Sequence, residues 1–237
     1  MTVSTTLRIG LVVPVLNNFD QAIDLIYSAK TKHDLKIYIQ PQYLYQIPLA
    51  AAWNNGISQA IKDECDYIIV SNDDVLFAPH TIDALVEQRY SNPYSSVVMT
   101  FPVDVKDDLI NDYDILFVDE SQSFNAQAIE DQSYSCFIID PNFFDKCGTF
   151  DENFDPAWWE DTDMKYRIHL LGLETVQTSI PYVHRRHQTT KKLTIPANSI
   201  KSGNYYVAKW GSAHKNLNEF YKSPYNSELS PKEWRQK

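Results

Sequence analysis

Hydrophobic and polar positions divide the first hundred residues into alternating strands and helices. Residues 7–15 are apolar and rich in β-branched side chains, which is typical of a strand buried on both faces. Residues 20–30 instead place Ile23, Ile26 and Tyr27 at helical spacing. By the same two patterns we predict further strands at 35–40, 66–71 and 96–101, and further helices at 48–62 and after Pro79.

The order of these elements predicts the fold class. Strands joined through helices run parallel with right-handed crossovers, so we expect an α/β fold with a mostly parallel central sheet flanked by helices. Ligands of such sheets bind beyond the carboxyl ends of the strands. The residues expected at that edge are Pro14, Val15, Asn17, Gln40 and residues 72–74.

The pattern becomes less regular after residue 102. The helix with the clearest boundaries spans residues 160–171, with Gly172 as its C-cap. Beyond Pro196 the pattern changes again, to a short helical tail. The other elements predicted in this part are strands at 115–118 and 134–140, and helices at 141–147, 199–210 and 214–221.

Length and charge narrow the classes of function. A chain of 237 residues suits one domain with an appendage. The net charge of −10, from 31 acidic and 21 basic residues, disfavours nucleic acids and anionic membranes as partners. A phosphate-bearing ligand remains compatible with this charge if a divalent cation bridges ligand and protein. We place the domain at residues 1–195, with halves 1–102 and 103–195, and a helical tail packed on it at 196–237.

The chain lacks the patterns of a secreted or membrane protein. Cys65, Cys136 and Cys147 have no metal-ligand spacing and are expected to be free thiols of a reducing compartment. The longest apolar run, residues 9–16, is far shorter than the ~20 residues of a membrane span. The first eight residues lack the basic and apolar regions of a signal peptide. We therefore expect a cytoplasmic protein without a transmembrane segment.

An acidic pair follows the strand predicted at 66–71. Asp73 and Asp74 stand directly after Asn72, and two adjacent carboxylates are costly unless a positive charge lies beside them. Mg²⁺ or Mn²⁺ prefers oxygen ligands and often bridges substrate phosphates, so either cation suits this position. The alternative is a turn in which Asn72 and Asp73 cap backbone groups.

A second acidic cluster, with two tryptophans before it, opens the helix predicted at 160–171. Glu160, Asp161 and Asp163 in the first turn favour the helix dipole and can pair with basic residues one turn further on. This explanation does not account for Trp158 and Trp159. Aromatic rings beside carboxylates are typical of a sugar site. Because adjacent side chains of an extended segment face opposite ways, we expect Trp159 to face the sugar and Trp158 to pack inward.

These motifs together resemble GT-A-fold glycosyltransferases. The first half is similar to glycosyltransferase family 2, with an apolar strand ending in a proline and Asn17, then WNNGISQA, then a strand and NDDV. In that family the acidic pair is the DxD-type motif, so the resemblance implies that Asp74 binds the metal and Asp73 approaches the ribose. Gln40 and Gln42 stand where family 2 usually has an aspartate that reads uracil, although a glutamine amide can also pair with a pyrimidine. The implied nucleotide-sugar site consists of Pro14, Val15, Asn17, Gln40, Asn54, Asn72, Asp73 and, from the tail, Lys209.

The WWED segment is similar to the acceptor-site motif of β-1,4-galactosyltransferases. In those enzymes the aspartate of the Glu-Asp pair is the catalytic base, which implies this role for Asp161. The implied acceptor or sugar site also includes Trp158, Trp159, Glu160 and Asp163.

Two further segments extend the resemblance towards the C-terminus. In HRRHQTTKK, His187 takes the place of the metal-binding histidine of the galactosyltransferases, and His184 that of their metal-binding methionine. Histidines three residues apart point to opposite faces of a regular strand, so both can bind the metal only if the backbone turns here. The tail motif YYVAKWG also resembles such transferases, where Lys209 is expected over the pyrophosphate unless this helix simply covers the core.

The resemblance implies an inverting, metal-dependent glycosyltransferase with Mn²⁺ or Mg²⁺ as its cofactor. The expected donor is a UDP-sugar, first UDP-galactose and then UDP-glucose or an N-acetylated hexose. The expected acceptor is a glycan or glycoconjugate, joined through a β-linkage. One alternative is a sugar nucleotidyltransferase, although VPVLNNFD lacks its glycine-rich, basic signature. The other is a non-catalytic module that binds a sugar nucleotide or a metal.

Overall fold

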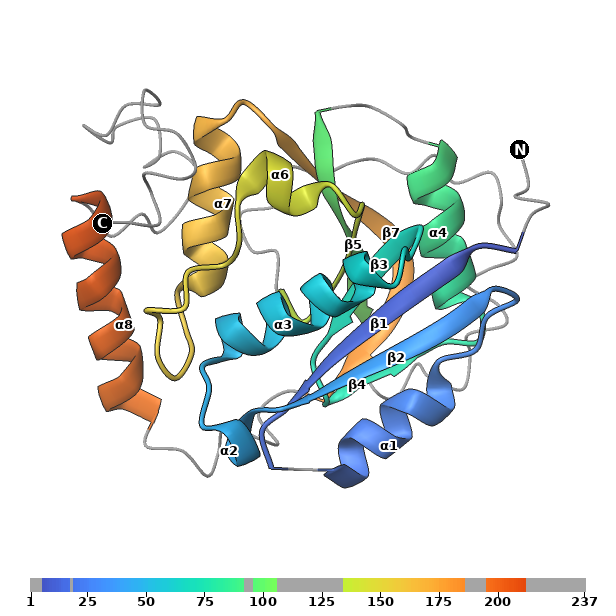
Figure 1. Ribbon diagram of the computed structural model, residues 1–237, viewed down its shortest axis with the longest axis horizontal. Coiled ribbons are helices and arrows are strands. Elements are labelled where there is room, and N and C mark those ends of the chain that lie inside the picture. The colour runs from blue at the N-terminus through green and yellow to red at the C-terminus, as the bar shows by residue number, and fades with distance from the viewer. Residues whose placement is uncertain (1–5, 18, 92–95, 106–133, 186–194, 212–237) are drawn as a thin grey trace.

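The computed structural model describes residues 6–17, 19–91, 96–105, 134–185 and 195–211. Within these ranges helices cover both faces of a seven-stranded sheet of order β2-β1-β3-β6-β5-β7-β4 (Figure 1). The strands are β1 (Arg8–Val15), β2 (Asp34–Pro41), β3 (Tyr67–Ser71), β4 (Val75–Phe77), β5 (Val97–Val105), β6 (Cys136–Ile139) and β7 (Glu174–His184). The helices are α1 (Phe19–Ser28), α2 (Gln42–Tyr45), α3 (Leu49–Lys62), α4 (Thr81–Ser91), α6 (Phe143–Cys147), α7 (Glu160–Leu170) and α8 (Ile195–Trp210).

The sheet is mixed rather than mostly parallel, which corrects our expectation. β1 lies parallel to β2 and β3, as the crossovers predict, and β5 lies parallel to β7. β6 comes between β3 and β5 and is antiparallel to both, while β4 is antiparallel to β7. Hydrophobic patterning shows which segments are strands but not which strands become neighbours, so this insertion was not predicted.

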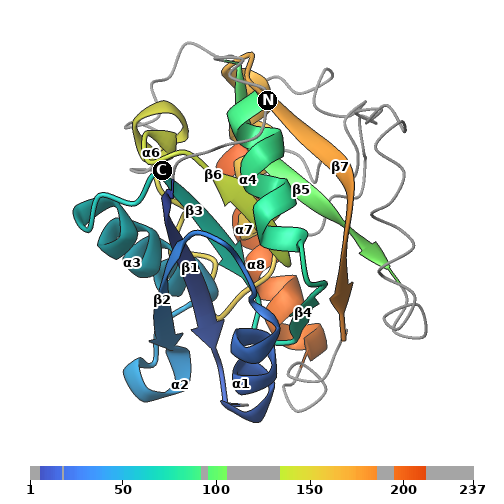
Figure 2. The same cartoon turned by 90° about the vertical axis from the view of Figure 1, so that its right-hand side faces the viewer.

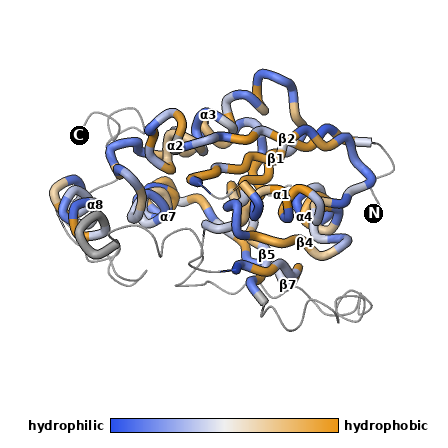
Figure 3. The backbone as a smooth tube through the Cα atoms, turned by 90° about the horizontal axis from the view of Figure 1, so that it is seen from below, coloured by the Kyte–Doolittle hydropathy of each residue, from blue (hydrophilic) through white to orange (hydrophobic). Residues whose placement is uncertain are grey.

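Two hydrophobic layers hold the helices to the sheet. Alternate residues of β1 point to opposite faces, so Leu11 and Val13 pack under α1 and α4, whereas Val12 packs under α3. α6 and α7 share the face of α3 (Figure 1, Figure 2). β1 is hydrophobic over most of its length in Figure 3, as expected for a strand covered on both sides.

The predicted elements of the first half agree with the structure to within about two residues at most ends. β7 and the three-residue β4 were missed, and so was the short α2. The strand predicted at 115–118 and the helix predicted at 214–221 lie outside the described residues. Across the described ranges, no helix combines the length and the apolar character needed to cross a membrane.

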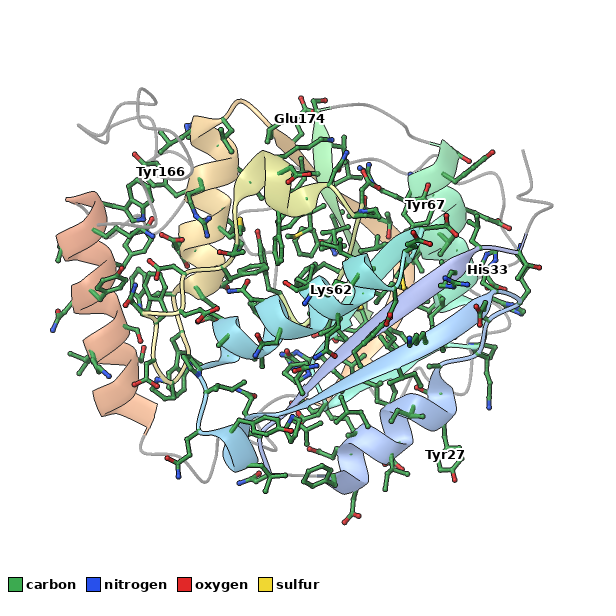
Figure 4. All side chains as sticks on the ribbon, in the orientation of Figure 1. Tyr27, His33, Lys62, Tyr67, Tyr166 and Glu174 are labelled. Carbon is green, nitrogen blue, oxygen red and sulfur yellow. The ribbon has the colours of Figure 1, made fainter. Side chains whose placement is uncertain are left out.

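α8 packs beside α7 at one end of the molecule (Figure 3). A separate hydrophobic cluster joins them, in which Phe154 and Tyr166 meet Tyr206 and Trp210. Tyr166 meets the ring of Trp210 edge-on, with ring centroids 4.9 Å apart, between the two helices (Figure 4).

Gly56 marks the closest approach of α3 to the sheet, and its replacement is our first prediction. A Cβ atom at Gly56 would lie 2.3 Å from Cγ1 of Val12, so α3 would have to move away from β1. Although alanine favours a helix by roughly 1 kcal/mol over glycine, we expect Gly56→Ala to lower the free energy of unfolding by about 1–3 kcal/mol. Urea denaturation measures this, with Asn55→Ala at the exposed neighbouring position as the control. A more stable Gly56→Ala protein would contradict the packing described above.

Candidate active site

The acidic turn between β3 and β4 is fixed from both sides. The amide of Asn72 donates to the carbonyl of Ser135 at 2.8 Å, and the amide of Arg185 donates to the carbonyl of Asp74 at 2.8 Å. The side chains of Asp73 and Asp74 are both largely buried. The turn thus presents its carboxylates from a rigid backbone at the carboxyl end of β3.

His184 brings the end of β7 to this turn. Its Nε2 lies 3.1 Å from Oδ1 of Asp74, because the register of β4 and β7 pairs Val75 with His184. The backbone amide of His184 donates to Oδ1 of Asp104 at 3.1 Å. Asp104, near the end of β5, was not singled out from the sequence, since its contact depends on the unpredicted strand β7. His187 lies outside the described residues.

The pair of Asp74 and His184 suits a divalent cation. A carboxylate oxygen and an imidazole nitrogen are ligands that Mn²⁺ accepts. Neighbouring ligands at about 2.1 Å from an octahedral cation lie roughly 3.0 Å apart, close to the 3.1 Å observed. Nδ1 of His184 is buried and has no hydrogen-bond partner within the described part of the chain. No group of three such ligands forms among the described residues, so any third ligand comes from elsewhere.

The ends of β1 and β2 meet at the same edge of the sheet. Pro14 lies opposite Gln40, and Val15 lies opposite Pro41 in the parallel register. Pro14 and Val15 are buried, whereas Asn17 is exposed. Gln40 is buried, and its Nε2 donates to Oε1 of Gln59 at 3.3 Å.

Asn54 has a different environment from the one we expected. Its amide accepts from the backbone N–H of Phe150 at 2.9 Å and donates to the carbonyl of the same residue at 2.8 Å. A further bond reaches Oε1 of Glu152 at 2.8 Å. The amide of Asn54 therefore holds the loop before α7 instead of facing a nucleotide sugar.

Lys209 and Asp163 are also corrected by the structure. The side chain of Lys209 is 2% exposed, and its Nζ lies 2.6 Å from Asp151 and 2.7 Å from Asp163. Asp163 is fully buried and also accepts from Nε of Arg167 at 2.9 Å and from Nε1 of Trp210 at 2.7 Å. Lys209 therefore does not lie over a pyrophosphate, and Asp163 is not open to a sugar. Both belong to a buried ion cluster between α7 and α8.

The two tryptophans form a turn rather than an extended segment. Trp158 and Trp159 have φ values of 72° and 74°, in the left-handed region that side chains rarely adopt. Trp159 packs on α8, with its ring centroid 5.1 Å from that of Tyr206. Trp158 is half-buried and has no ring contact or hydrogen bond within the described ranges. Trp159, which is also half-buried, is thus the ring that packs on α8, whereas we expected Trp158 to pack inward.

The two carboxyl groups that open α7 have different environments. Glu160 is 5% exposed, and its Oε2 has no hydrogen-bond partner in the part of the chain described. Burial, and secondly the neighbouring charge of Asp161, raise the pKa of Glu160 to about 8. Asp161 is only half-buried, and its Oδ1 accepts from the amide of Thr162 at 2.7 Å. Glu160 is thus protonated at neutral pH and Asp161 is the more accessible of the two.

The raised pKa of Glu160 predicts a pH-dependent effect on stability. Between about pH 4.5 and pH 8 the unfolded state has lost this proton and the folded state keeps it, so stability falls as the pH rises through this window. We expect Glu160→Gln to remove this loss and to raise the thermal midpoint more at pH 8 than at pH 5. Thermal unfolding at the two pH values measures it, with the exposed Glu64→Gln as the matched control. Equal shifts in both variants would contradict the assignment.

Comparison with known proteins identifies the fold. Residues 42–150 match the family model of glycosyl transferase family 2. No curated protein sequence matches the chain. Among solved structures, Drosophila β1,4-galactosyltransferase 7 in complex with xylobiose matches with a TM-score of 0.55 and 15% identity, over 79% of this chain and 74% of that one. A mutant of the same enzyme with manganese, UDP-Gal and xylobiose matches with a TM-score of 0.53 and 14% identity, over the same shares.

A third structure has the same fold with another sugar nucleotide. The mannosyltransferase PcManGT from Pyrobaculum calidifontis, in complex with GDP-Man and Mn²⁺, matches with a TM-score of 0.50 and 13% identity, over 78% of this chain and 59% of that one. These likenesses confirm the expected GT-A fold, and the family match confirms the resemblance to family 2 over residues 42–150. The chain therefore has the GT-A fold, and its residues 42–150 match the model of glycosyl transferase family 2.

Proposed function

We propose that the enzyme transfers a hexose from a UDP-sugar to a hydroxyl group of a glycan, with inversion at the anomeric carbon. The observation that carries the proposal is the pair of sites at one edge of the sheet. Asp74 lies after β3 and His184 is the last residue of β7, while Glu160 and Asp161 follow a loop tied to the start of α3. This tie is the hydrogen bond from the amide of Leu49 to the carbonyl of Pro156, 2.9 Å long.

The donor side centres on the metal. Asp74 and His184, with His187, would hold Mn²⁺ or Mg²⁺, which neutralises the departing diphosphate. Asp73 and the backbone of residues 14–15 lie where the nucleoside would bind, with Gln40 beside its base. Galactose is our first choice of sugar, because the WWED and HRRH segments resemble those of galactosyltransferases and a structure of the same fold holds UDP-Gal.

On the acceptor side we assign the role of base to the more accessible of the two adjacent carboxyl groups. Glu160 is buried and keeps its proton at neutral pH, so it does not accept the proton of the acceptor hydroxyl. This leaves Asp161 to accept the proton of the attacking hydroxyl, as that oxygen bonds to the anomeric carbon opposite the leaving diphosphate. Trp158, the ring without a partner among the described residues, supplies the apolar face for the sugar.

Metal removal tests the donor side. We expect turnover of UDP-galactose to vanish with EDTA and to return with Mn²⁺, because no other cation is assigned to neutralise the diphosphate. Asp74→Asn should abolish the Mn²⁺-dependent binding of UDP in calorimetry. Asp66→Asn, at an exposed aspartate before β3, is the control and should bind as the wild type does. Full turnover in excess chelator would rule the metal out.

The base is tested by a substitution that preserves shape. Asp161→Asn removes the proton acceptor, and we expect kcat to fall about 10²-fold or more. The affinity for UDP and Mn²⁺ should remain unchanged, since the residues proposed to bind the metal belong to other elements than α7. Asp145→Asn, on the exposed side of α6, is the control. A nearly normal kcat in Asp161→Asn would show that another group accepts the proton.

A further inference from the structure

The contacts of α8 are concentrated on the loop that leads into α7. Ser202 Oγ donates to the carbonyl of Ala157 at 2.9 Å. Tyr205 Oη donates to Asp151 at 2.8 Å, and the buried Lys209 binds the same carboxylate. α8 therefore holds the loop at several points between Asp151 and the first residue of α7.

Among these contacts, the one between the Trp159 indole and α8 is the closest packed. A Cβ atom at Gly203 would lie 3.1 Å from both Cε2 and Nε1 of the Trp159 indole and 3.2 Å from its Cζ2. An alanine at this position would therefore require the ring or α8 to shift by a few tenths of an ångström, and Tyr206 packs against the ring from the next turn.

Trp159 is also the residue from which α7 starts. Its carbonyl accepts the amide of Asp163 at 2.8 Å, the first hydrogen bond of the helix. Its φ of 74°, after the 72° of Trp158, is a conformation that persists only where the surroundings impose it. The position of the indole on α8 therefore determines where the first turn of α7, with Glu160 and Asp161, begins.

We propose that Trp159 is a positioning residue for the reaction, and that Gly203 is the gap in α8 that sets its place. The proposal rests on the proposed function, in which Asp161 accepts the proton of the acceptor hydroxyl. It assigns to α8 a role in aligning this carboxyl group. No contact between Trp159 and the substrate is required.

A size exchange between the two residues tests the proposal. Gly203→Ala fills the gap, while Trp159→Phe removes the indole atoms nearest to it. Because a displacement of about 1 Å can cost roughly a hundredfold in rate, we expect the shift of a few tenths of an ångström in Gly203→Ala to lower kcat for UDP-galactose turnover roughly two- to sixfold. The double variant should recover to the level of Trp159→Phe alone. Ile200→Ala, on the exposed face of α8, is the matched control.

Two further measurements separate positioning from stability. The affinity for UDP and Mn²⁺ should be the same in all variants, and hydrogen exchange in residues 157–163 should be faster in Gly203→Ala and restored in the double variant. A lower thermal midpoint with normal kcat and normal exchange in these residues would overturn the proposal. So would independent, additive effects of the two substitutions. If the wild type turns over no UDP-sugar, the proposed function fails, whereas exchange and additivity still decide the coupling between Trp159 and Gly203.

Discussion

The buried carboxylate of Asp163 is the group on which the acceptor side of the molecule depends. It accepts from Arg167 on its own helix and from Lys209 and Trp210 on α8. A buried charge that loses one such partner is strongly destabilising, because no water replaces it. α7 and α8 therefore cannot separate without breaking the bonds of this buried carboxylate to Lys209 and Trp210. Hydrophobic contacts between the two helices add to this constraint. These contacts are not directional, whereas the hydrogen bonds of the carboxylate are.

This constraint extends along the first turn of α7 to the candidate base. Asp161 is two residues before Asp163 in the same turn, so its backbone is held by the same ion cluster. The loop before it is held from the opposite side by α3, through Asn54 and the carbonyl of Pro156. The left-handed backbone of the two tryptophans is thus enclosed between two anchored helices, which is the condition for such a conformation to persist.

Most elements were predictable from the sequence where burial is complete on both faces. β1, β3 and β6 are short runs of mostly apolar residues, and all three were predicted. β7 was missed because its residues Glu174 to His184 mix polar side chains with a proline, as in a strand that is only partly covered. The ion pair between Lys209 and Asp163 could also not be predicted from the sequence. Charged residues on a helix are usually solvated, and these two partners lie 46 positions apart in the chain.

The tryptophan pair shows why local rules fail at this site and what the failure implies. Side chains alternate between faces only in an extended backbone, and both tryptophans are left-handed instead. The turn directs the ring of Trp159 to α8 and places Glu160 in the interior behind it, where the absence of water raises its pKa. Asp161, one residue later, stays accessible. A single backbone feature thus buries one of two neighbouring carboxyl groups, whose pKa rises, and leaves the other accessible. The accessible carboxyl group is the one that a transfer to a hydroxyl group can use as a base.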